Sequence, residues 1–509
     1  MRTLAACLLL LVVAGLAPAD NPVPKPDVIV VCPPAFRPAL QPWLADRRAQ
    51  SLSIQTIAPE RTAVAQQDAI NKFVNDQTTS ILLVGDAPVF GQVCGATEIP
   101  IFHRPTTVTG KFNSTATLAT DLPYAGGRDI AVGRLPVRTP AELSVVVDKI
   151  LASDHSRDFG PWRSRLELVG GVGGFGVLID TAIESTARTI LTSSLPASTR
   201  PGVLYGSPGH RFYPTDQSFR AAVVDRYRRG CRFWIYAGHG RVTALDRVPR
   251  PSAENPAGGP PVLDAASADQ LTGPRGSIAL MLACFNGAVD APPRCLAERM
   301  LTTPGGPVAV IAGTRVTMPY GNSMLSLSLI NQVYERRVTT LGKAWRGSIA
   351  AMTAADPAEH AGGGGGALPA MLGGIAAMMH GDAATADAER IEHAALFQLL
   401  GDPTMKLHPP AATVALTAKP SGDAIGFELT SPIPGHATVR LDHPLGVRSG
   451  SGDPNDTQIA EQIVSLAADE VFTGRIDTGD LPAGHYNLTV HLADDSGWAA
   501  GAAKIYLAR

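Results

Sequence analysis

The sequence has no marked excess of either charge: 43 basic and 45 acidic residues among 509 give a formal net charge of −2. It contains no basic stripe of the kind that binds nucleic acid and no polybasic cluster that would bind an anionic membrane. Beyond the first twenty residues it also lacks any run of about 18 apolar residues, the length that crosses a bilayer. We therefore expect no nucleic-acid partner and no stable membrane insertion.

The amino terminus carries the one pronounced apolar run. Arg2 precedes the apolar stretch from Leu8 to Leu16, which closes with the small-residue pattern Ala17-Pro18-Ala19. A short positive region, a short apolar region and a small-x-small site are typical of a secretory signal peptide. The sequence therefore predicts a signal peptide over residues 1–19 and an exported protein, either secreted or held in the periplasm or at the cell surface.

Cysteines are few. The chain has six, and removal of Cys7 with the signal peptide leaves five. An odd number in an exported protein leaves at least one thiol without an intramolecular partner. Cys32 and Cys94 follow neighbouring predicted strands and could form a disulfide, although the pairing cannot be read from sequence.

The length favours two to four folding units, and no solenoid-type repeat is present. Buried strands alternate with helical patterns in residues 27–157 and again in residues 160–408, which indicates two α/β units. Residues 411–509 instead show short alternating stretches separated by Gly, Pro and Asp turns, which predict an antiparallel β-sandwich. The expected fold class is α/β, with two adjacent subdomains of mainly parallel sheet followed by the small sandwich.

Two strand exits carry residues that could do chemistry. The apolar run Phe233 to Ala237 ends in Gly238-His239-Gly240, and the run Ile278 to Ala283 ends in Cys284. In parallel α/β sheets ligands bind at the carboxyl ends of strands. A loop histidine or a buried cysteine is often chemically inert, but here 284 − 239 = 45 residues separate the pair, close to the spacing of about 50 found in caspases. An imidazole beside a thiol can deprotonate it and later protonate the leaving amine.

The chain resembles the gingipain-type cysteine peptidases, relatives of the caspases. Five short motifs carry this resemblance in order along residues 27–407, namely Leu83-Val84-Gly85-Asp86, Ile130-Ala131-Val132-Gly133-Arg134, Tyr236-Ala237-Gly238-His239-Gly240, Ala283-Cys284-Phe285-Asn286-Gly287 and Leu399-Leu400-Gly401-Asp402-Pro403. The family also carries an immunoglobulin-like domain after the peptidase unit, in the place of the β-rich tail. The resemblance implies a caspase-like fold.

The resemblance also implies roles for individual residues. Cys284 would be the nucleophile, His239 the base, and the backbone N–H groups of Gly240 and Cys284 the oxyanion hole. Asp180 falls near the aspartate that binds a substrate cation in the arginine-specific members, with a helix N-cap as its alternative role. Arg315 falls in a loop that lines the specificity pocket in the family, with a solvated surface arginine as its alternative.

The chain departs from the family pattern in two places. Where the family has an acidic residue that orients the histidine, the Gly-rich turn here has Gly173, so we expect a catalytic dyad or an acid from elsewhere. The long pro-domain of gingipains is also missing between the predicted cleavage site and the first strand.

The function expected from the sequence is a secreted cysteine endopeptidase that acts on protein or peptide substrates through a thioester acyl-enzyme. No metal and no cofactor are expected at the site, whereas a structural calcium ion and the oligomeric state cannot be read from the sequence. A catalytically silent relative that binds at the cell surface or in the periplasm is the alternative. A nucleotide-binding protein is a second alternative suggested by Gly170 to Gly174, but the dinucleotide pattern does not follow.

Overall fold

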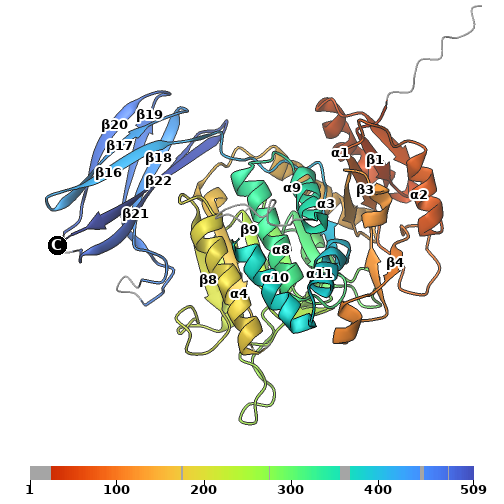
Figure 1. The fold of residues 1–509 in the computed structure, drawn as a ribbon. Coiled ribbons are helices and arrows are strands. Elements are labelled where there is room, and N and C mark those ends of the chain that lie inside the picture. The colour runs from red at the N-terminus through yellow and green to blue at the C-terminus, as the bar shows by residue number, and fades with distance from the viewer. Residues whose placement is uncertain are drawn as a thin grey trace, which may run out of the picture.

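The computed structural model describes residues 25–173, 176–273, 276–355, 367–447, 452–479 and 481–508. The predicted signal peptide, residues 1–19, lies outside the described residues. Figure 1 shows three regions in a row, with the amino-terminal unit at one end, the second α/β unit in the middle and the carboxy-terminal β-sandwich at the other end.

One ten-stranded sheet runs through both α/β units, in the order β2-β1-β3-β6-β14-β13-β12-β9-β7-β8. In that order the strands are Ile54–Ile57, Val28–Val31, Ser80–Val84, Ala131–Leu135, Phe397–Leu400, Ala309–Gly313, Ile278–Leu282, Phe233–Ala237, Arg165–Gly170 and Arg200–Tyr205. Strands β1, β3, β6, β9, β12 and β13 are buried from end to end or nearly so. Apolar runs of this kind are what a parallel sheet covered on both faces requires.

Strand β14 joins the two halves of the sheet. It pairs parallel with β6 through Leu400 and Arg134, and antiparallel with β13 from Val310 to Gly313. The strands of the amino-terminal half therefore run opposite to those of the second half, β13-β12-β9-β7-β8. The α/β class with a terminal sandwich is confirmed, and the structure adds that the two predicted sheets are continuous.

The loop after β14 stabilises the junction between the two halves of the sheet. Asp402 is fully buried and accepts hydrogen bonds from Trp43 Nε1 and Arg47 Nη2, both at 2.6 Å, and from the backbone N–H of Thr404 at 2.7 Å. Arg47 also pairs with the buried Asp154 at 2.6 Å. The Gly-Asp-Pro motif thus ties the central strand to the first helix of the chain.

Helices flank the sheet, and α4, α8, α10 and α11 pack against one another over one of its faces (Figure 1). Several begin at the capping residues that the sequence offers: the Thr139 hydroxyl accepts from the N–H of Glu142, with Pro140 at the first helical position. The helices are α1 Arg37–Ala49, α2 Ala63–Asn71, α3 Pro140–Asp154, α4 Val177–Thr189, α5 Phe219–Arg228, α6 Ala265–Ala268, α7 Leu296–Thr302, α8 Pro319–Ile330, α9 Leu341–Thr353, α10 Ala367–His380 and α11 Ala383–Leu396.

The carboxy-terminal sandwich consists of a five-stranded sheet, β15-β22-β21-β18-β19, and a three-stranded sheet, β16-β17-β20. Their bounds, in chain order from β15 to β22, are Ala412–Thr413, Ala415–Ser421, Ala424–Thr430, Gly435–Asp442, Gln458–Leu466, Val471–Asp477, Gly484–Ala493 and Trp498–Leu507. Inward-facing side chains such as Phe427, Val439 and Leu488 form its separate core.

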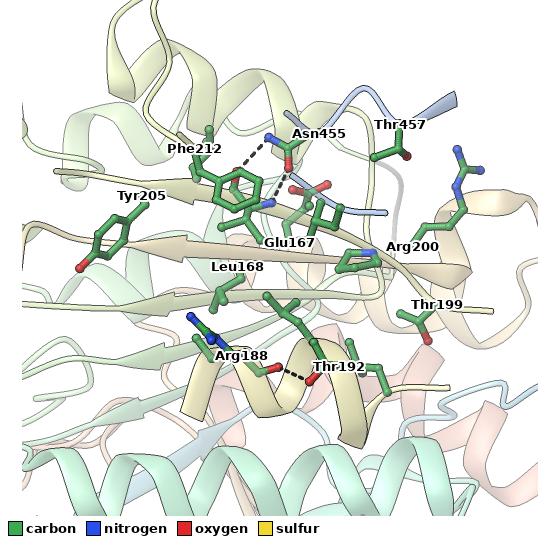
Figure 2. Close-up of a pocket in the computed structure, with 18 of the residues that line it drawn as sticks. Glu167, Leu168, Arg188, Thr192, Thr199, Arg200, Tyr205, Phe212, Asn455 and Thr457 are labelled. Carbon is green, nitrogen blue, oxygen red and sulfur yellow. Dashed lines mark hydrogen bonds between the residues drawn. The ribbon is translucent and has the colours of Figure 1, made fainter. Parts of the chain in front are cut away.

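The sandwich also contacts the free edge of the large sheet. Asn455, in the connection between β18 and β19, accepts a hydrogen bond from the N–H of Val203 at 2.7 Å and donates one to the carbonyl of Val203 at 2.9 Å. Figure 2 shows this amide above edge strand β8. The side chain therefore occupies the place of a neighbouring strand, which protects an exposed edge.

Candidate active site

The register of two neighbouring strands brings His239 and Cys284 together. Strands β9 and β12 pair in parallel, and Ala237 lies opposite Leu282 in the last pair. His239 and Cys284 each follow two residues later, so they leave the sheet at the same level of the same edge. Because neighbouring strands lie about 4.8 Å apart, the two residues lie close together at this edge.

The turns after the two strands are in close contact. A Cβ atom on Gly240 would lie 2.7 Å from the carbonyl oxygen of Cys284 and 2.5 Å from Asn286 Oδ1. Only glycine fits this approach, which explains the second glycine of the Gly-His-Gly segment. The fully buried Asn286 donates from Nδ2 to the carbonyl of Arg241 at 2.6 Å and so links the loop after Cys284 to the hairpin after His239.

Cys284 lies at a sharp turn. Phe285, directly after it, has a φ of 61°, a left-handed conformation that is rare for a bulky residue. The N–H of Phe285 donates to the carbonyl of Arg315 at 3.0 Å, which fixes the turn. Cys284 is half-buried, and its sulfur accepts a hydrogen bond from the N–H of Thr317 at 3.3 Å. The thiol is thus held in place at the surface of the strand exit.

Three charged side chains act on His239. Burial is the largest influence and lowers the pKa of His239 below its ordinary value, and the guanidinium of Arg250 lowers it further. The carboxylates of Asp246 and Asp180 oppose this and raise the pKa of the imidazole. A lowered pKa leaves the ring neutral near pH 7, the state in which it can accept a proton from a thiol.

Asp180 lies close to the Gly-rich turn. Helix α4 begins at Val177 with Gly176 as its N-cap, so Asp180 lies within the first turn, and its expected alternative role as the N-cap residue is wrong. The reason is that Gly176 occupies the N-cap position, where no side chain accepts a hydrogen bond from the helix. A Cβ atom on Gly173 would lie 3.3 Å from the Asp180 carboxyl carbon, so this carboxylate fills the space beside the residue where a side chain is lacking.

A large cavity of about 1270 Å³ reaches this region. Gly171, Gly173, Asp180 and Gly238 line one part of it, and Asn455 and Thr457 of the sandwich line another. Figure 2 shows the part along β8. Neither His239 nor Cys284 is among the described residues that line it, so the cavity adjoins the two side chains without containing them.

Comparison with known proteins decides the family. The family model of peptidase family C25 matches residues 21–408, which is most of the chain. The chain belongs to peptidase family C25. Members of this family are cysteine peptidases, and the resemblance to gingipains is confirmed. No curated protein matches the chain at the sequence level.

Solved structures agree with the fold of a C25 peptidase. The Arg-specific cysteine proteinase gingipain R is 16% identical, with a TM-score of 0.52, and the match covers 94% of this chain and 98% of that one. The Porphyromonas gingivalis RgpB pro- and mature-domain complex is 16% identical with a TM-score of 0.51, covering 94% and 99% of the two chains. At such identities the likeness shows the fold and leaves specificity open.

Arg315 of this C25 peptidase lies in a buried ion pair. Its Nη1 and Nη2 atoms contact the two carboxylate oxygens of Asp290 at 2.9 and 2.5 Å, and its Nε donates to the carbonyl of Thr117 at 2.8 Å. His103 adds a hydrogen bond to the same carboxylate at 3.0 Å. The side chain is 7% exposed, so it is not the solvated surface arginine considered from the sequence, and its guanidinium is committed to the scaffold beneath the Cys284 loop.

The five cysteines of the described chain are free thiols, and the disulfide considered between Cys32 and Cys94 is not formed. Among the described residues no cluster of metal-ligating side chains is present, and no helix there has the length and apolar character to cross a membrane.

No role was predicted from the sequence for two residues near the site, Asn286 and Asp246. Asn286 stands within a motif but gives no sequence signal for its hydrogen bond to the hairpin. Asp246 lies seven residues after His239, and a two-residue turn between the short strands β10, Gly240–Arg241, and β11, Ala244–Leu245, would have been needed to place it.

Proposed function

We propose that this C25 peptidase is a secreted cysteine endopeptidase in which Cys284 is the nucleophile and His239 the general base. The observation that carries the proposal is the strand register, which delivers both residues to one level of one sheet edge. The fixed turn at Phe285 and the contact between Gly240 and Cys284 support it.

The reaction follows from this arrangement. His239 takes the proton of the Cys284 thiol, and the sulfur attacks the scissile carbonyl carbon to give a tetrahedral intermediate. The N–H groups of Gly240 and Cys284 would stabilise its oxyanion, and one such donor contributes about 10²–10³-fold to kcat in a serine protease. His239 then protonates the departing amine and leaves a thioester. Water, deprotonated by His239, attacks the thioester and releases the acid and the free thiol. No cofactor takes part in the proposed reaction.

The proposed substrate preference is for a basic residue before the scissile bond. Asp180 lines the cavity beside Gly173 and Gly238, and a carboxylate in a partly dry pocket binds guanidinium through short charge-assisted bonds. Arg315 takes no part in this proposal because its guanidinium pairs with Asp290.

The test uses peptide acyloxymethyl ketone probes, which alkylate an activated thiol. We expect wild type to be labelled at Cys284 and to hydrolyse peptides, Cys284→Ala to lose both, and His239→Ala to lose at least about 10²-fold in turnover. Cys231→Ala is the matched control, since Cys231 is a fully buried thiol whose pKa burial raises well above the ordinary value. A folded wild type without labelling or hydrolysis would favour the silent binding protein instead. Export would be tested separately by N-terminal sequencing, with Asp20 expected as the first residue.

A further inference from the structure

A tight hairpin places a carboxylate opposite His239. Strands β10 and β11 pair antiparallel, with Gly240 opposite Leu245 and Arg241 opposite Ala244. The pairing continues one step further, because the N–H of Asp246 donates to the carbonyl of His239 at 3.1 Å. Residues directly opposite one another in an antiparallel pair point their side chains to the same face, with Cβ atoms about 5 Å apart. The register therefore places Asp246 directly opposite His239 in the hairpin, and its carboxylate raises the pKa of the imidazole.

Hydrogen bonds to strand β9 fix the backbone of His239 and Asp246. The hydroxyl of Tyr236, a fully buried residue of β9, donates to the carbonyl of His239 at 2.9 Å, and the N–H of Asp246 lies 3.4 Å from the same hydroxyl. At the tip of the hairpin, the N–H of Leu296 donates to the carbonyl of Val242 at 2.7 Å. The His239–Asp246 pair is thus part of a fixed scaffold and not of a free loop.

The Asp246 carboxylate can accept a further hydrogen bond. Its side chain is 13% exposed, and Oδ1 accepts from the N–H of Arg247 at 3.0 Å. Oδ2 is buried and lies 3.5 Å from Arg250 Nη2 in an ion pair, yet it makes no hydrogen bond within the described part of the chain. A buried carboxylate oxygen normally accepts a hydrogen bond. Because Oδ2 of Asp246 has no donor in the described part of the chain, an imidazole N–H of His239 is a candidate donor.

The ion pair with Arg250 offers a competing explanation for the position of Asp246. It also donates to the carbonyl of Val172 at 3.0 Å, so Asp246 could serve only to anchor Arg250 against the Gly-rich turn. Asp180 is the other carboxylate that acts on His239, but it belongs to α4 and reaches the site across Gly173. Of the two carboxylates, Asp246 is the one whose backbone is bonded directly to the histidine.

We propose that Asp246 is the positioning residue of the site, and that its carboxylate accepts a hydrogen bond from the N–H of one imidazole nitrogen of His239 and so turns the other nitrogen toward Cys284. This inference rests on the proposed function. It assigns the two nearby acids to separate tasks: Asp246 orients the base, and Asp180 faces the substrate. A carboxylate behind a catalytic imidazole fixes its tautomer and stabilises the imidazolium that forms during the reaction.

The first test needs no catalysis. The pKa of His239 is measured by NMR in ¹³C-histidine-labelled Cys284→Ala protein, with the signal assigned through His239→Gln. Asp246, Asp180 and Arg250 are the charged groups that act on His239. We expect Asp246→Asn to lower the pKa of His239 by about one to two units and Arg250→Gln to raise it, since they remove opposite charges. If Asp246 only anchors Arg250, both variants move the pKa in the same direction, and the proposal is overturned.

The second test uses the active chain. We expect Asp246→Asn to lose about 10²-fold in kcat, to move the acid limb of the pH profile downward, and to keep its P1 preference and most of its KM. Asp246→Glu, which restores the charge, should recover the His239 pKa. Asp180→Asn is the matched control and should change P1 preference and KM instead. Unchanged kcat and pH profile in folded Asp246→Asn would overturn the assignment, whereas a peptidase-inactive wild type with the expected NMR shifts would overturn the proposed function alone.

Discussion

Asn286 offers a direct test of how the chain would build the proposed oxyanion hole. The side chain is fully buried, its Nδ2 donates to the carbonyl of Arg241 at 2.6 Å and more weakly to that of Ala244 at 3.4 Å, and its Oδ1 packs against the Cα of Gly240. Asn286→Ala removes the donor from these carbonyls and opens a space beside Gly240. A buried acceptor left without its partner costs about 1–3 kcal/mol of stability.

The effect on activity should exceed the effect on stability. The N–H of Gly240 is a proposed oxyanion donor, and its position depends on the contact that Asn286 makes. A displacement of about 1 Å at a catalytic group can cost about 10²-fold in rate, so we expect kcat/KM of Asn286→Ala to fall by about that factor. The assay compares peptide hydrolysis with the urea midpoint of the same protein.

Asn455→Ala is the matched control. It also removes an amide, here half-buried, that bonds a backbone segment at both its N–H and its carbonyl, but on edge strand β8, two strands away from β9. The control should lose comparable stability and keep its kcat/KM. If Asn286→Ala stays within about threefold of the control in kcat/KM, the loop contact does not position the oxyanion hole and the reasoning fails.

Three further outcomes follow from buried or half-buried carboxylates. Asp402→Asn should destabilise the Cys284→Ala protein by about 1–3 kcal/mol, since it removes the charge that Trp43 and Arg47 bind, while Arg47 keeps its pair with Asp154; a urea midpoint equal to that of the exposed control Asp382→Asn would contradict this. Burial, reinforced by Asp86, raises the pKa of Glu298 from 4.5 to about 8, so the folded state holds an extra proton between these values and stability should fall as pH rises through that window. Glu298→Gln cannot titrate and should flatten this dependence in thermal unfolding from about pH 5 to about pH 8; an unchanged slope would assign it to other groups. Asp180→Ala should lose the preference for Arg or Lys in a library varied at P1, and an unchanged preference would show that Asp180 does not bind the P1 side chain.

The strands of the sheet and the placement of His239 and Cys284 at one of its edges could be predicted because their signals are local. Apolar runs such as Phe233 to Ala237 and Ile278 to Leu282 indicate buried strands, and ends of parallel strands meet at one edge. The order of the strands could not be predicted. Nothing in the sequence of residues 397–400 shows that this last strand lies in the middle of the sheet. Nor does it show that the strands on its two sides run in opposite directions.

The surroundings of the site depend on contacts between distant segments. Arg315 meets Asp290, 25 residues away, and through it His103, 187 residues from Asp290 along the chain, so a buried ion pair stands where the sequence suggested a pocket residue. The N-cap alternative for Asp180 was wrong because α4 begins three residues earlier, after Gly176, where no side chain caps the helix. The motif residues Asp86, Arg134 and Asp402 resemble the family yet bind the scaffold: Arg134 is fully buried against Asp121 and backbone carbonyls.

The central position of β14 means that the ten-stranded sheet can be completed only late in synthesis. This strand is the last of the sheet to be synthesised, yet β6 and β13 both need it as a neighbour. Until residue 400 has left the ribosome, the edges of two half-sheets lack their partner, and Asp402 cannot bond Trp43 and Arg47. Cys284 and His239 are therefore made more than a hundred residues before their support is complete. We expect a nascent or truncated chain that stops short of β14 to be an inactive peptidase, which would delay proteolysis until the chain is nearly finished.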